Sequence, residues 1–166
     1  MSKCEVVVLT DKEILNKVSA LLKKHNYKIA VAESCTGGLI SNNLTDISGS
    51  SEYFDRGIVS YSNSSKIELL SVSEELIIKH GAVSSEVAEA MADGVRHKSN
   101  VDIGLSTTGI AGPTGGTSGK PVGLVFIAVS TKKNTMVKKF NFNGKRLDIK
   151  KQACEASLKM LLDVLE

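Results

Sequence analysis

The chain has 166 residues, of which 42% are hydrophobic and 23% charged, and its formal net charge is +3. This size and composition predict a single globular domain over residues 1–166, with a lead-in over residues 1–10. A net charge of this size does not indicate a nucleic-acid-binding protein. No apolar run approaches the roughly 20 residues that a membrane-spanning helix needs.

Hydrophobic spacing divides the chain into alternating helices and strands. Apolar residues at helical spacing predict helices over 11–25, 39–46 and 73–80, helices that begin near 66 and near 84, and a last helix from 146 onward. Short apolar or alternating runs predict strands over 27–32, 54–61, 101–107, 122–130 and 135–143. The glycine-rich stretch 108–121 has neither pattern, and irregular loops of this length are usually functional or disordered.

Strands that alternate with helices predict a three-layer α/β/α sandwich around a mixed, mostly parallel central sheet. The last two strands, joined by the short turn 132–134, are expected to be antiparallel, with 135–143 at an edge of the sheet. In such sheets ligands bind beyond the carboxyl ends of the strands. Three stretches that contain candidate reactive or ligand-binding residues lie there, namely 34–38, 61–66 and 108–116.

The first of these stretches carries a candidate nucleophile. The apolar run 29–32 ends in small polar residues and the next periodic segment opens within a few positions, so we expect the chain to turn from strand into helix at Ser34, which puts the hydroxyl at a helix N-terminus. Gly37 and Gly38 have no Cβ, so that a substrate can approach the backbone closely. Ser34 is then a nucleophile whose oxyanion is held by the following N–H groups, or it is simply the cap of the helix.

A serine nucleophile needs a base, and the three histidines are poorly placed for this role because each falls in the last turn of a predicted helix. Lys66 is the alternative, since burial or a helix N-terminus lowers the pKa of an amine and Ser-Lys pairs are a known variant of the catalytic triad. Tyr61, at the end of the preceding strand, is placed to relay or donate a proton. The alternatives to these catalytic roles are that Lys66 is an ordinary solvated lysine, and that Tyr61 is a structural residue with a buried ring and a hydroxyl exposed to solvent.

Two neighbours of Ser34 have open roles. Cys35 is a rival nucleophile if the helix lowers the pKa of its thiol, or a small residue that fills space in the core. Glu33 either orients Lys66 or caps the helix. With Cys4 and Cys154 the chain has three cysteines, an odd number without Cys-x-x-Cys spacing, which predicts reduced thiols and no metal site. The lack of a membrane span and of a leader-like N-terminus predicts a cytoplasmic location.

The loop 109–116 is glycine-rich enough to wrap a phosphate with its backbone N–H groups, although it matches neither the Walker A nor the Gly-x-Gly-x-x-Gly pattern. Lysines are concentrated near the C-terminal end of the chain, and we expect most of them to form a solvated face, with one or two able to meet a phosphate.

Several segments taken together resemble the CinA C-terminal-domain family over about residues 11–165. They are Ala32-Glu-Ser-Cys-Thr-Gly-Gly38, Gly49-Ser-Ser51, Arg56-Gly-Ile-Val-Ser-Tyr-Ser-Asn63 with Lys66, His80-Gly-Ala-Val-Ser84, Gly109-Ile-Ala-Gly-Pro113 and Lys120-Pro-Val-Gly123. The resemblance implies deamidation of nicotinamide mononucleotide to nicotinate mononucleotide and ammonia, without a cofactor. It also implies Ser34 as nucleophile, assisted by Tyr61 and Lys66.

With this chemistry, the substrate contacts are expected from both glycine stretches and one cation, namely Glu33, Cys35, Thr36, Gly37, Gly38, Thr108, Gly109, Ala111, Gly112 and Arg146. The alternative hypothesis is a nucleotide-binding or regulatory module that uses the same pocket without turnover. In either case the expected partner is a small nucleotide, and apolar residues at an edge strand are a plausible contact for self-association.

Overall fold

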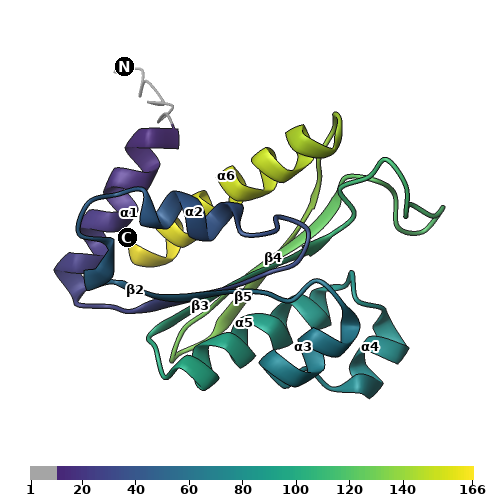
Figure 1. The fold of residues 1–166 in the computed structure, drawn as a ribbon, viewed down its shortest axis with the longest axis horizontal. Helices are drawn as coiled ribbons and strands as arrows, with labels where there is room; N and C mark the ends of the chain where they lie inside the picture. Colours follow the sequence, from purple (N-terminus) through teal and green to yellow (C-terminus); the bar gives the residue numbers. More distant parts are fainter. Residues whose placement is uncertain (1–10) are drawn as a thin grey trace, which may run out of the picture.

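A five-stranded sheet with the order β2-β1-β3-β4-β5 lies between two layers of helices in the computed structural model (Figure 1), which describes residues 11–166. Cys4 and the lead-in therefore lie outside the described residues. The strands are β1 (Ile29–Glu33), β2 (Phe54–Val59), β3 (Ile103–Gly109), β4 (Leu124–Ser130) and β5 (Thr135–Asn141). The helices are α1 (Asp11–His25), α2 (Leu39–Thr45), α3 (Asn63–Leu70), α4 (Glu74–His80), α5 (Ser85–Ser99) and α6 (Arg146–Leu165), with a 3-10 helix, η1, at Ser50–Glu52.

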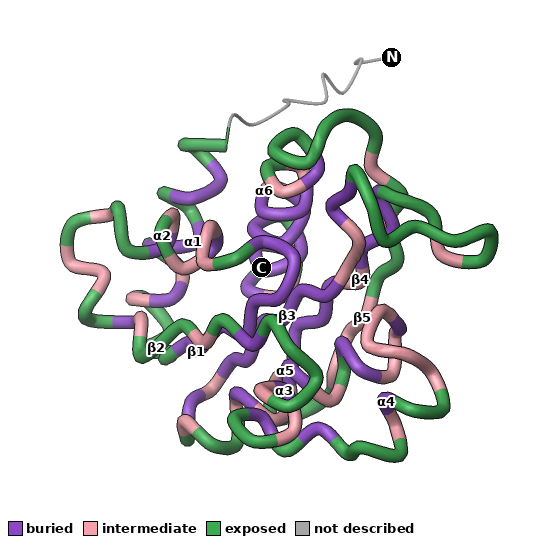
Figure 2. Tube along the Cα trace, turned by 45° about the vertical axis from the view of Figure 1, so that its right-hand side comes forward, coloured by how far each residue is buried: buried purple, intermediate pink, exposed green. Residues whose placement is uncertain are grey.

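The alternation of side chains along β1 explains the two helical layers. Ile29 and Val31 pack with apolar residues of α1, α2 and α6, whereas Ala30 and Ala32 pack with residues of α3, α4 and α5. Figure 1 shows the same division, and Figure 2 shows buried backbone along β1 and β3 in the centre of the molecule. A strand buried on both faces reads as a continuous apolar run, as β1 and β4 do in the sequence.

The predicted α/β class with a mixed sheet is confirmed, and the antiparallel part is larger than expected. β1 pairs in parallel with both β2 and β3, whereas β4 is antiparallel to β3 as well as to β5. The loop after β3 therefore returns the chain as a hairpin instead of a crossover. β5 forms one edge of the sheet, as its alternating pattern predicted, and β2 forms the other.

Helix starts follow local capping. Ser62, Ser73 and Ser84 have extended backbone and accept hydrogen bonds from N–H groups three residues later, at the starts of α3, α4 and α5. The helix predicted from about residue 66 therefore begins at Asn63, one turn earlier. α2 begins at Leu39, where the sequence predicted it, but the turn over residues 35–38 separates it from Ser34, so the prediction that Ser34 lies at the helix N-terminus is wrong.

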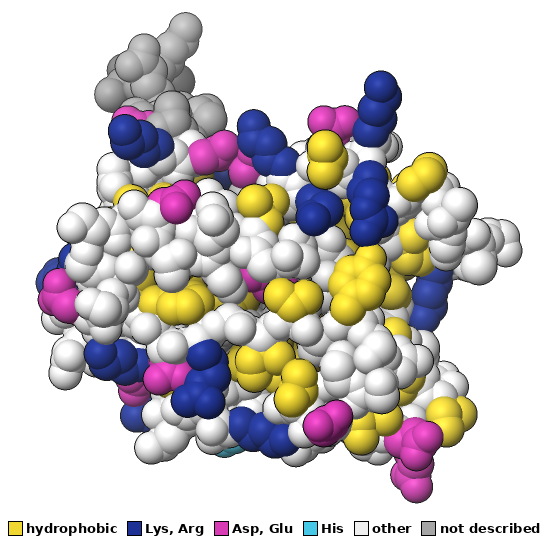
Figure 3. Space-filling model, in the orientation of Figure 1, with side chains coloured by type: hydrophobic (Ala, Val, Ile, Leu, Met, Phe, Trp, Pro, Cys, Tyr) yellow, Lys and Arg dark blue, Asp and Glu magenta, His cyan; other side chains and the backbone are white. Residues whose placement is uncertain are grey.

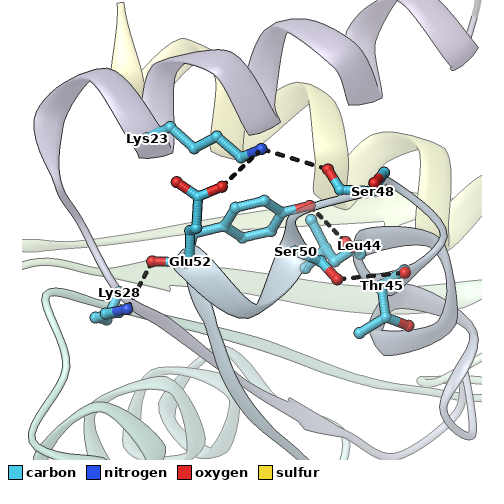
Figure 4. Close-up of polar contacts among 8 residues, drawn as sticks. Lys23, Lys28, Leu44, Thr45, Ser48, Ser50 and Glu52 are labelled. Atoms are coloured by element: carbon cyan, nitrogen blue, oxygen red, sulfur yellow. Dashed lines mark hydrogen bonds and ion pairs between the residues drawn. The ribbon is translucent and has the colours of Figure 1, made fainter.

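The connection from α2 to β2 is held to the rest of the fold by several polar contacts (Figure 4). The Lys23 ammonium, from α1, donates to the carbonyl oxygen of Ser48 and pairs with the Glu52 carboxylate at 3.4 Å. The Lys28 ammonium donates to the carbonyl oxygen of Glu52 at 2.6 Å, and the buried Tyr53 hydroxyl donates to that of Leu44. These contacts fix the entry of β2 into the sheet and hence the position of its far end.

None of the helices within residues 11–166 is both long enough and apolar enough to cross a bilayer.

Candidate active site

Ser34 lies in a tight turn between the end of β1 and the start of α2. Its N–H donates to the carbonyl oxygen of Thr107 at 3.0 Å, and its own carbonyl accepts from the N–H of Gly37. Gly37 and Gly38 have φ values of 62° and 100°, which glycine adopts without strain. The turn holds the Ser34 hydroxyl at the carboxyl end of the parallel strands.

Glu33 caps α2 and is fully buried. One carboxylate oxygen accepts from the N–H groups of Gly38 and Ile40 and from the Thr36 hydroxyl, and the other accepts from the N–H and hydroxyl of Ser41. Negative charge at a helix N-terminus is favourable, because it satisfies N–H groups that have no partner within the helix. Of the two roles open to Glu33, the structure therefore shows the cap, and Ser34 is not the capping residue.

Lys66 reaches Ser34 from α3, although the two residues are 32 positions apart. Its Nζ atom lies 3.1 Å from the Ser34 Oγ, 2.7 Å from the carbonyl oxygen of Ser60 and 3.3 Å from that of Tyr61. The side chain is only 1% exposed. Burial, which disfavours the charged form, lowers the pKa of the Lys66 amine below its ordinary value of 10.5.

The arrangement around Lys66 suits a base. In the neutral amine, two N–H groups donate to the carbonyl oxygens of Ser60 and Tyr61, so the lone pair faces the Ser34 hydroxyl. In the ammonium form the third N–H donates to the same hydroxyl oxygen. The geometry thus allows a proton to pass between Ser34 and Lys66 without movement of either main chain.

Cys35 and Thr36 contribute backbone to this turn. Burial raises the pKa of the Cys35 thiol to about 11, so the thiol is protonated at neutral pH, as befits a core residue. Thr36 is fully buried and its hydroxyl lies 2.8 Å from that of Thr107. Within residues 11–166, the N–H groups of Cys35 and Thr36 donate to no other residue, so neither is committed to a partner in the protein.

Tyr61 follows β2, and its side chain is 59% exposed. Its hydroxyl accepts a hydrogen bond at 2.9 Å from the Arg146 guanidinium, which also donates to the carbonyl oxygen of Gly112 at 2.8 Å. Arg146 is the first residue of α6, so one cation joins the segment after β2 to the glycine-rich loop. The structure places the Tyr61 carbonyl against Lys66 and the Tyr61 hydroxyl against Arg146.

The second glycine stretch begins within β3, which extends through Thr108 and Gly109. The Thr108 hydroxyl donates to the carbonyl oxygen of Ala82 at 2.8 Å, so it is already bound by the protein. Ala111 is buried in the same apolar cluster as Cys35, whereas Gly112 presents its carbonyl to Arg146. Thr108, Ala111 and Gly112 are buried and Gly109 is partly buried, so contacts between this stretch and a substrate stay a prediction.

Lys150 is one of the C-terminal lysines of which one or two were expected to meet a phosphate, and the sequence analysis did not single it out. Its Nζ lies so close to Gly37 that a Cβ built there would be 3.4 Å away. Lys150 and Arg146 are one turn apart at the start of α6, a position where positive charge is disfavoured by the helix dipole. Figure 3 shows Lys and Arg side chains gathered over this part of α6. The signal in the sequence was the four-residue spacing of two cations at a predicted helix start.

The histidines lie where they were predicted, in the last turns of α1, α4 and α5. His25 stacks on Tyr27, His80 pairs with Glu86, and His97 contacts Arg96. Among residues 11–166, no group of three or more His, Cys, Asp or Glu side chains is arranged to hold a metal ion.

The fold and the Ser34 turn belong to a known family. Residues 11–165 match the CinA C-terminal domain, and the chain belongs to that family. It is 49% identical over 158 residues to a CinA-like protein of Syntrophus aciditrophicus, and 54% identical over 144 residues to one of Desulfotalea psychrophila. These alignments cover 95% and 87% of this chain but only 38% and 35% of the relatives, so the chain spans less than half the length of the curated relatives that it matches.

Solved structures of similar length share the fold. The competence/damage inducible protein CihA from Agrobacterium tumefaciens matches with a TM-score of 0.92 at 34% identity, over 98% of this chain and 100% of that one. A competence-damaged protein (CinA) superfamily protein from Enterobacter cloacae matches with a TM-score of 0.93 at 30% identity, over 100% of this chain and 99% of that one.

Proposed function

We propose that this protein is an amidohydrolase that converts nicotinamide mononucleotide to nicotinate mononucleotide and ammonia, with Ser34 as nucleophile and Lys66 as base. The observation that carries the proposal is the buried Lys66 amine, 3.1 Å from the Ser34 Oγ and held by two carbonyl oxygens. A fully buried lysine without a carboxylate partner is expensive, and in a purely structural site we would expect an apolar residue.

Acylation begins when the Ser34 oxygen attacks the carboxamide carbon while its proton passes to the neutral Lys66 amine. The N–H groups of Cys35 and Thr36 support the negative charge on the carbonyl oxygen. The C–N bond then breaks, the leaving nitrogen takes the proton from Lys66, and ammonia departs. We assign this protonation to Lys66, which holds the serine proton at this point and whose Nζ lies 3.1 Å from the Ser34 Oγ.

Deacylation repeats the same proton transfers with water as the nucleophile. The water oxygen attacks the ester carbon while Lys66 accepts a proton from the water. Lys66 then returns this proton to the Ser34 oxygen as the ester bond breaks. The products are the carboxylic acid and the free serine, so no cofactor is consumed. Arg146 and Lys150 supply positive charge at one side of the Ser34 turn, which suits the phosphate of a nucleotide.

The test is to incubate the purified protein with nicotinamide mononucleotide and measure ammonia and nicotinate mononucleotide together. We expect equal amounts of both products, and none from the Ser34→Ala or Lys66→Met variants. Binding of the nucleotide by calorimetry without release of ammonia would contradict the proposal and would favour the non-catalytic nucleotide-binding module.

A further inference from the structure

Ser60 has an unusual hydroxyl. Within residues 11–166, two buried side-chain oxygens have no hydrogen-bond partner, the Oγ atoms of Ser60 and Ser99. Ser60 is 0% exposed and adjoins the Ser34–Lys66 pair, whereas Ser99 ends α5. An unsatisfied buried hydroxyl costs roughly 1–3 kcal/mol, so such a group in a native protein needs an explanation.

The backbone of Ser60 is fully used, which fixes its position. Its N–H donates to the carbonyl oxygen of Glu33 at 2.8 Å, continuing the β1–β2 ladder beyond Val59, and its carbonyl accepts from the Lys66 Nζ at 2.7 Å. Side chains alternate along a strand. Val59 lies beside Gly38 on the α2 face, so Ser60 points to the α3 face, as Ser34 does after Glu33.

The proposed reaction changes the number of acceptors around Lys66. In the free enzyme, an ammonium at Lys66 has three acceptors, which are the Ser34 Oγ and the carbonyl oxygens of Ser60 and Tyr61. As Ser34 attacks, its oxygen becomes bonded to the substrate carbon in the tetrahedral intermediate and is then a poorer acceptor, at the moment when Lys66 has gained a proton. One N–H of a buried cation then loses its partner, which is costly.

We propose that Ser60 is a positioning residue, whose hydroxyl accepts the third N–H of the Lys66 ammonium in the tetrahedral intermediate, before the leaving nitrogen takes the proton. The inference rests on the proposed Ser34–Lys66 chemistry and goes beyond it by giving the unpaired hydroxyl a role. Rotation about the Cα–Cβ bond of Ser60 and movement of the flexible lysine end bring the two groups together. The hydroxyl is unpaired in the free enzyme because its partner is still bound to Ser34.

The ionisable groups around Lys66 come from three elements. Cys35 lies in the turn after β1, where burial raises the pKa of its thiol to about 11, and Tyr61 follows β2. Arg146 of α6 lies beyond the Tyr61 hydroxyl. The Glu33 carboxylate is held by the start of α2. None of these groups is altered by a substitution at Ser60.

The experiment compares Ser60→Ala, Ser60→Thr and the matched control Ser99→Ala with the wild type. Two rates are measured from pH 6 to 10: ammonia release from nicotinamide mononucleotide, and covalent labelling of Ser34 by a fluorophosphonate. Labelling requires the same proton transfer to Lys66 but no amide substrate, with fluoride as the leaving group. Unfolding free energies are measured in urea.

We expect Ser60→Ala to lower the maximal rates of both reactions about tenfold, which corresponds to one charge-assisted hydrogen bond of roughly 1.4 kcal/mol. The pH midpoint of labelling stays in place, because the Ser60 hydroxyl makes no hydrogen bond to the amine in the free enzyme and the Ser60 carbonyl is retained in the variant. The unfolding free energy of the Ser60→Ala variant is unchanged or higher than that of the wild type, since a methyl group replaces an unpaired hydroxyl. Ser60→Thr retains the hydroxyl and restores labelling, and Ser99→Ala leaves both rates unchanged.

Each other outcome is decisive. Wild-type rates in Ser60→Ala overturn the inference while leaving the amidase proposal intact. A loss of stability together with a shifted pH midpoint overturns it as well, because that pattern shows a structural role. If the wild type is labelled but releases no ammonia, the substrate proposal fails while a slower Ser60→Ala labelling still supports the inference. A wild type that is neither labelled nor releases ammonia overturns both.

Discussion

The Nζ atom of Lys66 lies 3.1 Å from the Oγ of Ser34, and the carbonyl oxygens of Ser60 and Tyr61 fix its direction. β1 and β2 run in parallel, so the turns that follow them meet at the same edge of the sheet. α3 begins directly after β2 and returns its fourth residue to that edge. Ser34 and Lys66 are distant in sequence, and the parallel pairing of β1 with β2 and the capped start of α3 bring them into contact.

The first prediction concerns pH. Lys66 must be neutral to accept the Ser34 proton, so kcat/KM rises with pH through the pKa of the free enzyme. Because burial lowers the pKa of Lys66 below 10.5, activity extends to lower pH than an ordinary lysine allows. A pH profile of kcat/KM measures the midpoint. A rise centred at 10.5 or above contradicts the assignment.

The same shift has a consequence for stability. A lysine whose pKa is lowered in the folded state is less protonated there than in the unfolded chain between the folded pKa and 10.5, so stability rises with pH across that window. We expect the unfolding free energy of the wild type, minus that of Lys66→Met, to increase as pH rises toward 10.5. Urea titrations at several pH values test this, and a decreasing difference contradicts it.

Ser34→Ala and Cys35→Ala separate the two candidate nucleophiles. We expect Ser34→Ala to lose roughly a thousandfold or more of the activity, as removal of a nucleophile does in serine hydrolases. Cys35→Ala should retain most of the activity, because a thiol with a pKa of about 11 is neutral at the pH of the assay. Steady-state ammonia release measures both. The reverse pattern would assign the nucleophile to Cys35.

Glu33→Gln tests the cap of α2. The carboxylate accepts from three N–H groups and two hydroxyls. In the glutamine variant an NH₂ group replaces one of the two oxygens, and the N–H and hydroxyl groups that faced this oxygen lose their acceptor. Each donor left unsatisfied costs roughly 1–3 kcal/mol, so we expect a loss of at least about 2 kcal/mol in unfolding free energy. Glu74→Gln, at the exposed start of α4, is the matched control and should cost less than about 1 kcal/mol. Equal losses in the two variants would show that Glu33 is not the cap.

Arg146 and Tyr61 should act as one unit. Tyr61→Phe removes the hydroxyl bound to Arg146, and Arg146→Ala removes the cation proposed to face the phosphate. We expect both to raise the KM for the nucleotide, and their effects to be less than additive in the double variant. Lys151→Ala, an exposed lysine paired with Glu155 on α6, is the control and should leave KM unchanged. Fully additive effects would contradict the coupling.

Lys150 is expected to contribute through charge alone. Lys150→Ala should raise the KM for nicotinamide mononucleotide about threefold to tenfold, and should leave the KM for the corresponding riboside, which lacks the phosphate, unchanged. Comparison of the two substrates at low and high salt measures this. An equal effect on both substrates would place Lys150 near the ring or the amide instead of the phosphate.

The sequence predicted the helices and strands well where periodicity and capping agree. The long apolar spacing of α6 and the capping serines of α4 and α5 are local signals, and the structure confirms these elements. The antiparallel return from β3 to β4 was missed, because a long glycine-rich loop permits either a hairpin or a crossover. Strand direction depends on packing across the sheet, which no local pattern encodes.

The candidate site was predicted in its residue types and less well in its geometry. Small residues after β1 correctly indicated a turn at Ser34, but the delay of α2 to Leu39 depends on the buried Glu33 carboxylate, whose partners lie up to eight positions away. The contact of Lys150 with the glycine turn joins segments over a hundred residues apart. Such contacts follow from tertiary packing and leave little trace in spacing.

β2 is bonded on one side only, and it carries the chain that delivers the amine to the serine. Edge strands open more readily than central ones, and such openings occur without global unfolding. Fraying of the β2 end would therefore switch the nucleophile off while the remaining sheet stays folded. Mild denaturant should therefore abolish the proposed activity before the circular dichroism signal of the helices declines. The reactivity of Ser34 would then report whether the hydrogen bonds between β1 and β2 are intact.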